Sequence, residues 1–320
     1  KNATINAGVD FTLFNNRLSG SLDWFRKRGK DIFHTMRIDC TKGYESVVMN
    51  YADLLNNGFE ASLSYDWFRP NEQRDFSWNS ALTLTFVKNE ITRVDEAATT
   101  PNALVAGGLK VGYPVHALFS LPYAGVEEVN GKGIPTWHKA DGSTTNDYLK
   151  SSDMSVVVYS GSEDPKTTIG FSNTLRYKGV SLSFLLVYYG GHYLRALQPS
   201  GMPGLQYRAF PSYLKDSWTP ENTDTLVPGF GQYSTQSTTS NIYYTDAFVR
   251  PAAFLKLRNI VVGYDLPQSF ARKLGMRSAS IRFQIDNPKA LWVKNDVGID
   301  PETGGIRQLT SYIFGINFNF

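Results

Sequence analysis

Large apolar side chains occupy every second position at the end of the chain, from Tyr312 to Phe320. In an extended strand, alternate side chains point to opposite faces. One face of this segment is therefore aromatic and aliphatic, while the other carries mostly glycine and asparagine. Such a strand is typical of a membrane β-barrel. A terminal core strand of a soluble β-sandwich is the alternative for this segment taken alone.

The same alternation recurs along the chain and predicts a series of strands. The cleanest case is the segment 58–67, in which Phe59 and Leu63 oppose Glu60 and Ser64. Most of the predicted strands have roughly the 9–11 residues that a tilted strand needs to cross a bilayer. The predicted strands are 3–13, 18–26, 58–67, 76–89, 168–177, 180–189, 254–264, 279–286 and 312–320. In 254–264 the apolar face switches near Asn259, which predicts a β-bulge.

The connections between these strands alternate between long and short. The long connections are 27–57, 90–167, 190–253 and 287–311, and the short ones are 14–17, 68–75, 178–179 and 265–278. If the strands run up and down, all long loops lie on one side, as in outer-membrane barrels. A soluble sandwich has no reason to sort its loops in this way. The sequence therefore predicts an all-β fold, an antiparallel transmembrane β-barrel segment of about nine strands with long extracellular loops.

The predicted strand count raises a question of closure. Bacterial single-chain barrels have even numbers of strands. An open sheet would leave backbone groups of two edge strands without partners in lipid. We therefore expect these strands to pair with others, from an upstream segment or a second chain. Since the sequence lacks an initiator methionine and a signal peptide, we expect a mature or internal fragment.

Composition agrees with this prediction and excludes other classes. Aromatic residues make up 14% of the chain, and no apolar run reaches the roughly 18 residues of a transmembrane helix. The net charge of +3 is spread along the sequence, so no nucleic-acid partner is expected. The single cysteine, Cys40, cannot form an intrachain disulfide.

Catalytic chemistry has no sequence signature here. The four histidines lie in predicted loops without a catalytic neighbour, and no GxSxG, HExxH or CxxC motif occurs. The adjacent carboxylates Glu127 and Glu128 would point apart in a strand, so a solvated loop is the better interpretation. Asp141-Gly142 is read as a plain turn, because the acidic spacing of a calcium loop is missing. We expect no enzyme activity, no catalytic residues, no metal and no cofactor.

Several ordered motifs resemble one family of membrane transporters. The most specific is the segment 254–267, FLKLRNIVVGYDLP, which is close to a family pattern FLRLKNVTLGYxLP. The others are 6–11 followed by 18–24, Asn57-Gly58-Phe59-Glu60, 112–114, 123–126, 133–135, 141–142, Asp300-Pro301-Glu302 and the closing FGINFNF. Over essentially all 320 residues, the chain resembles the C-terminal barrel portion of SusC/RagA-like TonB-dependent transporters of Bacteroidetes outer membranes.

This resemblance implies a large plugged barrel of about 22 strands. Residues 1–320 would supply its C-terminal part, with the plug, the TonB box and the N-terminal strands outside this chain. It implies active import of a complex nutrient, an oligosaccharide or oligopeptide, across the outer membrane. The implied partners are the remaining barrel strands and plug, a SusD-like surface lipoprotein acting as a lid, the TonB complex and outer-membrane lipid.

Two other functions remain open at this point. A passive porin or an adhesion barrel would have an open lumen without plug or TonB coupling. A soluble carbohydrate-binding module or glycosidase would bury its apolar faces in one core. The ordered motifs disfavour the first alternative, and the sorted loops disfavour the second.

Aromatic residues in the long loops are candidates for substrate contact, since flat rings suit sugars and peptides alike. They are Trp137, His138, Tyr193, Tyr207, Tyr213, Trp218 and Tyr233. Such side chains also fill a loop's own core. A second aromatic set is expected to anchor the strands at the membrane interface. It comprises Tyr65, Trp67, Phe76, Trp78, Phe318 and Phe320. The polar residues Glu60, Ser62, Asn79 and Arg282 are expected to face the lumen, where they line it or hold the plug.

Overall fold

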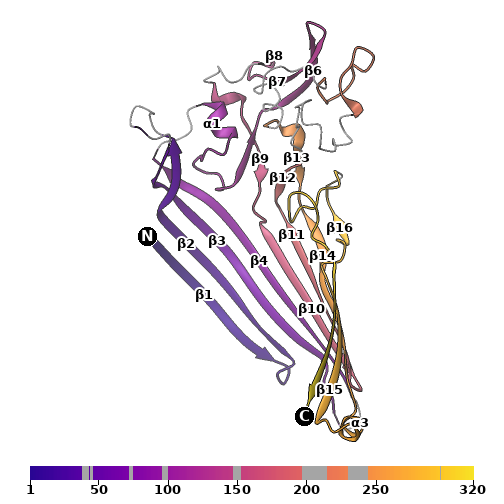
Figure 1. Cartoon of the computed structure of the whole chain (residues 1–320). Helices are drawn as coiled ribbons and strands as arrows, with labels where there is room; N and C mark the ends of the chain where they lie inside the picture. Colours follow the sequence, from indigo (N-terminus) through magenta and orange to yellow (C-terminus); the bar gives the residue numbers. More distant parts are fainter. Residues whose placement is uncertain are drawn as a thin grey trace.

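The computed structural model contains one antiparallel sheet with nine strands in a continuous order, β1-β2-β3-β4-β10-β11-β14-β15-β17 (Figure 1). The structure describes residues 1–37, 43, 46–71, 75–95, 100–146, 153–196, 215–229, 244–295 and 297–320. The strands are β1 (Asn2–Leu13), β2 (Leu18–Arg37), β3 (Ser46–Phe68), β4 (Phe76–Val94), β10 (Thr167–Tyr177), β11 (Val180–Gly190), β14 (Phe254–Asp265), β15 (Ser278–Asp286) and β17 (Ser311–Asn319). The short β16 (Trp292–Val293) also pairs with β14.

The sheet forms a curved wall whose short turns lie at one end and whose long connections lie at the other (Figure 1). This is the predicted sorting of loops. Among the described residues, no helix is both long enough and apolar enough to cross a membrane.

Strand register joins the apolar side chains into one continuous face. Opposite one another across successive strands lie Val9, Leu22, Ala61, Leu84 and Ile169. These residues define the outward face, and the alternate polar residues define the inner face. Large outward side chains remain exposed, as Phe86 (47%) and Phe314 (64%) show. Because burying such surfaces against lipid is favourable and leaving them in water is not, this face is the lipid-contacting side of a barrel wall.

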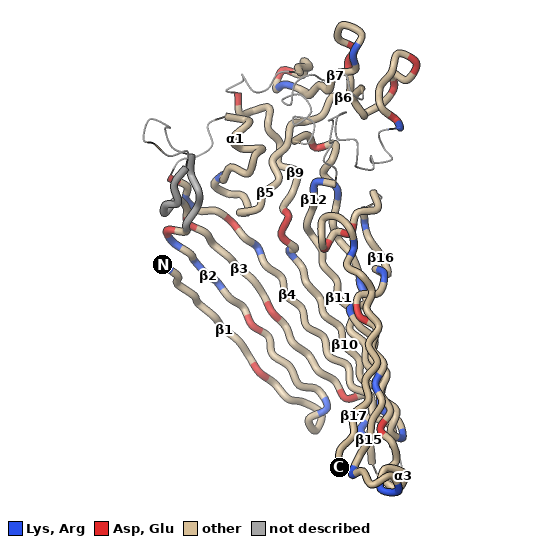
Figure 2. Tube along the Cα trace, viewed as in Figure 1, with Lys and Arg blue, Asp and Glu red and all other residues tan. Residues whose placement is uncertain are grey.

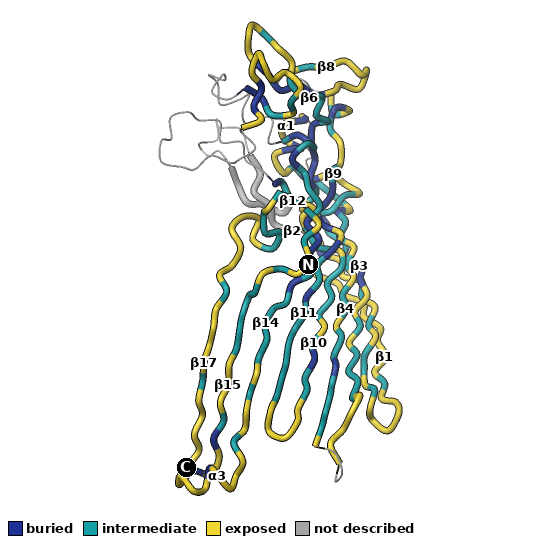
Figure 3. The backbone as a smooth tube through the Cα atoms, turned by 90° about the vertical axis from the view of Figure 1, so that its right-hand side faces the viewer, coloured by how far each residue is buried: buried dark blue, intermediate teal, exposed yellow. Residues whose placement is uncertain are grey.

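Buried residues are concentrated in the loops, not in the sheet (Figure 3). The connection between β4 and β10 contains α1 (Pro101–Val105), η2 (Met154–Val156) and five strands, β5 (Ala117–Ser120), β6 (Tyr123–Val129), β7 (Lys132–His138), β8 (Thr144–Thr145) and β9 (Val158–Ser162). A loop core forms where these elements meet: Leu104, Val105, Phe119, Leu121, Trp137 and Val156. The connection between β11 and β14 adds the pair β12 (Tyr193–Arg195) and β13 (Val249–Pro251), with η4 (Asp246–Phe248). The turn between β14 and β15 holds α3 (Gln268–Lys273).

The pairing of residues between neighbouring strands tests two of the sequence predictions. The β-bulge near Asn259 is confirmed: Leu185 pairs with Asn259 and Leu186 with Leu257, so Arg258 is the extra residue. The predicted long connection 27–57 is wrong in part. Residues 27–37 and 46–57 continue β2 and β3 as a paired hairpin beyond the predicted strands. Adjacent apolar pairs such as Val47-Val48 and Leu54-Leu55 interrupt the period-two alternation in this stretch, and so the alternation did not indicate its strands.

Four of the six aromatic residues predicted as interface anchors lie at the short-turn end of β3 and β4: Tyr65, Trp67, Phe76 and Trp78. The ring centroids of Tyr65 and Trp67 are 4.7 Å apart, and those of Trp67 and Trp78 are 5.4 Å apart. The Trp67 indole donates to Ser80 Oγ (3.0 Å), and the Trp78 indole to Asn173 Oδ1 (2.9 Å). Phe76 packs near Phe68, with centroids 5.5 Å apart, and both Phe318 and Phe320 are exposed. Their role as membrane anchors stays a prediction.

Charged residues of both signs are interspersed over the strands and loops (Figure 2). This distribution agrees with the small net charge of the chain.

Candidate functional site

A pocket of about 460 Å³ lies between the outer end of the sheet and the loop that connects β4 to β10. We call it the mouth pocket. The residues that line it are Asn56, Val87, Lys88, Asn89, Gly112, Tyr113, Pro114, Tyr159, Ser162, Asp164, Pro165 and Lys166.

The strand side of the mouth pocket belongs to the inner face. Asn56 and Asn89 are register partners on β3 and β4, three residues from the outward Phe59 and Phe86. Because side chains alternate along a strand, an odd offset puts the two asparagines on the inner face. Asn89 Nδ2 donates to Asn56 Oδ1 (2.7 Å), and Asn89 Oδ1 accepts from the Val115 amide (2.8 Å). The asparagine pair therefore joins two strands and holds the loop.

The loop side is fixed by backbone hydrogen bonds to β4. The Gly112 amide donates to the Ile91 carbonyl (2.9 Å), and the Ile91 amide donates to the Tyr113 carbonyl (2.9 Å). Gly112 has φ +87°, a left-handed conformation that favours glycine. Beneath this contact, Leu109 packs with Ile91 and Ala52 in a small buried cluster. The loop thus folds inward over the inner face.

Two tyrosines give the pocket an aromatic surface. The ring centroids of Tyr113 and Tyr159 are 5.1 Å apart, and Tyr113 also meets Phe119 edge-on at 5.1 Å. Burial, with the neighbouring Tyr193 and Tyr113 hydroxyls, raises the pKa of Tyr159. Its phenol is protonated at neutral pH and can donate a hydrogen bond.

Asp164 and Lys166 supply charges of opposite sign at the start of β10. Both carboxylate oxygens of Asp164 lie 2.9 Å from His116 Nδ1. The Lys166 amide donates to the Gly190 carbonyl (2.9 Å), and its carbonyl accepts from the Val87 amide (2.9 Å). The backbone of Lys166 therefore extends the ladder between β4 and β11, which fixes the root of its side chain.

The mouth pocket has the composition of a binding site. It combines aromatic surface with amide, phenol and ammonium donors, a composition typical of ligand sites. In the part of the chain that the structure describes, no cluster of three or more histidine, cysteine or acidic residues is placed to hold a metal ion.

A second polar cluster joins the last long loop to the wall. Lys256 Nζ lies 2.7 Å from Glu302 Oε2, and Arg258 contacts Glu302 Oε1 at 2.6 Å. The Lys256 side chain is only 4% exposed. Burial opposes ionisation of Glu302, but the hydrogen bonds from Arg258 and Lys256 outweigh it, so the pKa of this carboxyl is lowered.

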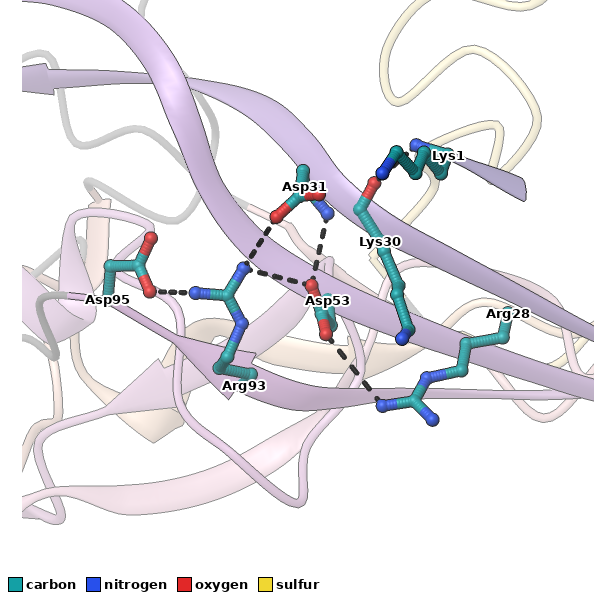
Figure 4. A network of polar contacts seen from close by, with 7 residues as sticks. All are labelled: Lys1, Arg28, Lys30, Asp31, Asp53, Arg93 and Asp95. Atoms are coloured by element: carbon teal, nitrogen blue, oxygen red, sulfur yellow. Dashed lines mark hydrogen bonds and ion pairs between the residues drawn. The ribbon is translucent and has the colours of Figure 1, made fainter. Parts of the chain in front are cut away.

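A third cluster joins β2 and β3 to the outer end of β4 (Figure 4). Arg93 contacts Asp31 and Asp53, each at 3.0 Å, and also Asp95. Asp53 accepts from the Asp31 amide (3.0 Å) as well, and Arg28 lies 3.8 Å from its other oxygen. Asp31 has φ +56° within the irregular part of the β2–β3 pairing. The cluster therefore holds the distorted base of this hairpin.

The predicted substrate aromatics do not line the mouth pocket. Trp137 (1% exposed) and Trp218 (2%) are buried, the first in the loop core and the second against Gly133. His138 is exposed at the end of β7, and Tyr193 (38% exposed) lies over Gly161. Tyr207, Tyr213 and Tyr233 lie outside the described residues.

Sequence reasoning missed the residues that do line the pocket. Tyr113 belongs to the loop motif 112–114, and nothing else in the sequence indicated a binding role for it. Asn56 lies just before the predicted strand 58–67, and Asn89 is the last residue of the predicted strand 76–89. At the end of a strand an asparagine indicates a turn. Tyr159 and Lys166 gave no signal, since their proximity to the asparagines depends on the fold.

Comparison with known proteins agrees with this architecture. No protein-family profile matches the chain. It is 24% identical over 318 residues to TonB-dependent receptor P3 of Formosa agariphila, covering 93% of this chain and 30% of that protein. It is 26% identical over 322 residues to receptor P26 of the same organism, covering 93% and 31%. It is 23% identical over 348 residues to TonB-dependent receptor SusC of Bacteroides thetaiotaomicron, covering 100% and 32%.

Among solved structures, the RagAB peptide transporter is similar with a TM-score of 0.78 at 24% identity, covering all of this chain and 35% of the matched chain. The RagAB peptide importer in its closed-closed state gives a TM-score of 0.76 at 26% identity, with the same coverage. The chain thus spans about a third of the length of the proteins it matches.

These likenesses confirm the expected resemblance to SusC/RagA-like TonB-dependent transporters. The chain is an all-β segment of an outer-membrane barrel, and its relatives are receptors and transporters, not enzymes. The outer-membrane location predicted from the sequence is confirmed on the same grounds.

Proposed function

We propose that this chain is the C-terminal barrel part of an active importer that takes a complex nutrient across the outer membrane. One observation carries the proposal: a nine-stranded wall with one continuous apolar face resembles TonB-dependent receptors over 93–100% of its length. Energy comes from the TonB complex, acting on a plug and TonB box that lie on the remaining part of the protein. A SusD-like lipoprotein covers the extracellular side.

The remaining barrel strands complete the wall. In this chain, β1 and β17 stand at the two edges of the sheet. An edge strand in lipid leaves amide and carbonyl groups without partners, at a cost of several kcal/mol per group by an order-of-magnitude estimate. Pairing with further strands at both edges removes this cost.

The nutrient is an oligomer, either an oligosaccharide or an oligopeptide. The solved RagAB neighbour is named a peptide transporter, which supports the second class without deciding it. The mouth pocket lies on the inner face near the extracellular loops, where an entering molecule meets the wall. His138 and Tyr193 are exposed loop aromatics that support further contact with the substrate.

The interface anchors complete the proposal on the membrane side. Tyr65, Trp67, Phe76 and Trp78 form one aromatic patch at the short-turn end, and Phe318 and Phe320 extend an exposed aromatic row on β17. Amphipathic rings favour the interfacial zone. We assign this patch to the periplasmic side of the bilayer.

The test combines composition and energy dependence. Mass spectrometry of the native complex extracted in detergent is expected to find a SusD-like lipoprotein and a plug-bearing barrel segment with this chain. Uptake by cells is expected to stop when TonB is deleted. Uptake that continues without TonB identifies a passive porin, and a chain that is soluble and monomeric without detergent contradicts the membrane assignment.

A further inference from the structure

We propose that the mouth pocket binds a carboxylate-bearing terminal unit of the transported oligomer. This inference rests on the proposed import function and deepens it. The same ligand chemistry has two sources, a uronic-acid residue of an acidic oligosaccharide and the C-terminal residue of a peptide. The experiment below separates them.

The side-chain amides in the pocket offer donors to a ligand. Both side-chain oxygens of the asparagine pair are already occupied. Asn56 Oδ1 accepts from Asn89 Nδ2, and Asn89 Oδ1 accepts from the Val115 amide. Among the described residues, Asn56 Nδ2 has no protein acceptor. The amide groups therefore present N–H bonds, which require an acceptor on the ligand.

The charges in the pocket point to the same ligand. The one acidic side chain in its lining, Asp164, is engaged by His116 through both oxygens. Lys166 Nζ has no carboxylate partner among the described residues. A ligand carboxylate would supply one and would accept charge-assisted hydrogen bonds, which are the stronger kind.

Aromatic surface beside these donors suits the rest of the terminal unit. Tyr113 and Tyr159 lie with ring centroids 5.1 Å apart, and Pro114 lines the same pocket. Rings of this kind pack against the C–H face of a sugar or against an amino-acid side chain. The pocket volume of about 460 Å³ holds a small unit and excludes a whole oligomer, so we assign only the terminal residue to it.

The backbone that carries these donors is held in place before any ligand arrives. Hydrogen bonds on both sides of Lys166 tie its backbone to β4 and β11, and Ile91 fixes Gly112 and Tyr113 through two more. Binding therefore orders side chains on a backbone that is already fixed, which favours affinity.

The test is calorimetric titration of the full-length protein in nanodiscs with matched probes. An oligogalacturonate trimer is compared with its methyl ester, and a tripeptide with its C-terminal amide. Each is titrated against the parent protein, Lys166→Met and the control Lys132→Met, which removes an exposed lysine of β7 outside the pocket lining. Unchanged heat-dependent mobility on gels establishes that each variant is folded.

We expect one free-acid probe to bind, with an affinity at least tenfold greater than that of its ester or amide. Lys166→Met should weaken binding of the acid by about tenfold or more, with no change for the neutral probe, and Lys132→Met should have no effect. The acid that binds identifies the source. Equal binding of acid and neutral forms, binding of no acid probe, or an unaffected Lys166→Met variant overturns the inference. TonB-dependent uptake in the same strains reports separately on the proposed function.

Discussion

Replacing Glu302 with alanine should release the last long loop from the barrel wall. In the native chain one carboxylate contacts two cations, Lys256 at 2.7 Å and Arg258 at 2.6 Å. Lys256 is almost fully buried, with 4% of its side chain exposed. The substitution leaves this ammonium without a counter-ion in a place that water does not readily reach.

The size of the effect follows from burial. Removing one partner of a buried ion pair costs about 3–5 kcal/mol. The Glu302 side chain is 21% exposed, so partial screening favours the lower value, about 3 kcal/mol. Opening of the loop should then become roughly a hundredfold more frequent.

Hydrogen exchange of the membrane-embedded protein measures this opening. The amides of Glu302, Gly304 and Gly305 report on it, because the first two donate to Asp300 and the third to Thr303 within the loop. Their exchange should accelerate in Glu302→Ala, while amides of the β1–β2 turn stay unchanged.

A second substitution separates the ion pair from simple loss of contact. In Glu302→Ala with Lys256→Met, the buried ammonium is gone and the remaining cation, Arg258, is partly exposed to water, so a substantial part of the protection should return. If exchange in Glu302→Ala equals that of the parent, or if the double variant is no better protected than the single one, the reasoning is refuted.

Three further changes probe other parts of the wall. Asp53→Ala removes the buried acceptor of Arg93, and exchange at the base of the β2–β3 hairpin should accelerate several-fold; an unchanged rate would contradict the role of the cluster. Trp78→Phe removes the indole donor to Asn173 and should lower thermal stability by about 1 kcal/mol, measured by heat-dependent gel mobility, and no shift would count against this bond. Burial lowers the pKa of His192 below 6.5, partly offset by the Asp164 charge. The unfolded chain therefore binds more protons between the lowered pKa and 6.5, and stability falls as pH drops through this window. Substituting phenylalanine for His192 should flatten that dependence in melting curves recorded from pH 7.5 to 5.5.

The local pattern determined the wall of this protein. Period-two alternation located all nine strands, because a lipid-facing strand must place apolar side chains at every second residue. The shift of that alternation near Asn259 predicted the bulge that register assigns to Arg258. The order of long and short connections predicted which end carries the loops.

Only the tertiary structure decided the site. Asn56, Asn89, Tyr113 and Lys166 are far apart in the sequence, and strand pairing and the inward fold of one loop bring them to a single pocket. Conversely, Trp137 looked like a binding residue and is buried in the loop core. Alternation is a local property and can be read from a few consecutive residues. The packing of a loop against the sheet depends on contacts between distant segments, which a short stretch of sequence does not contain.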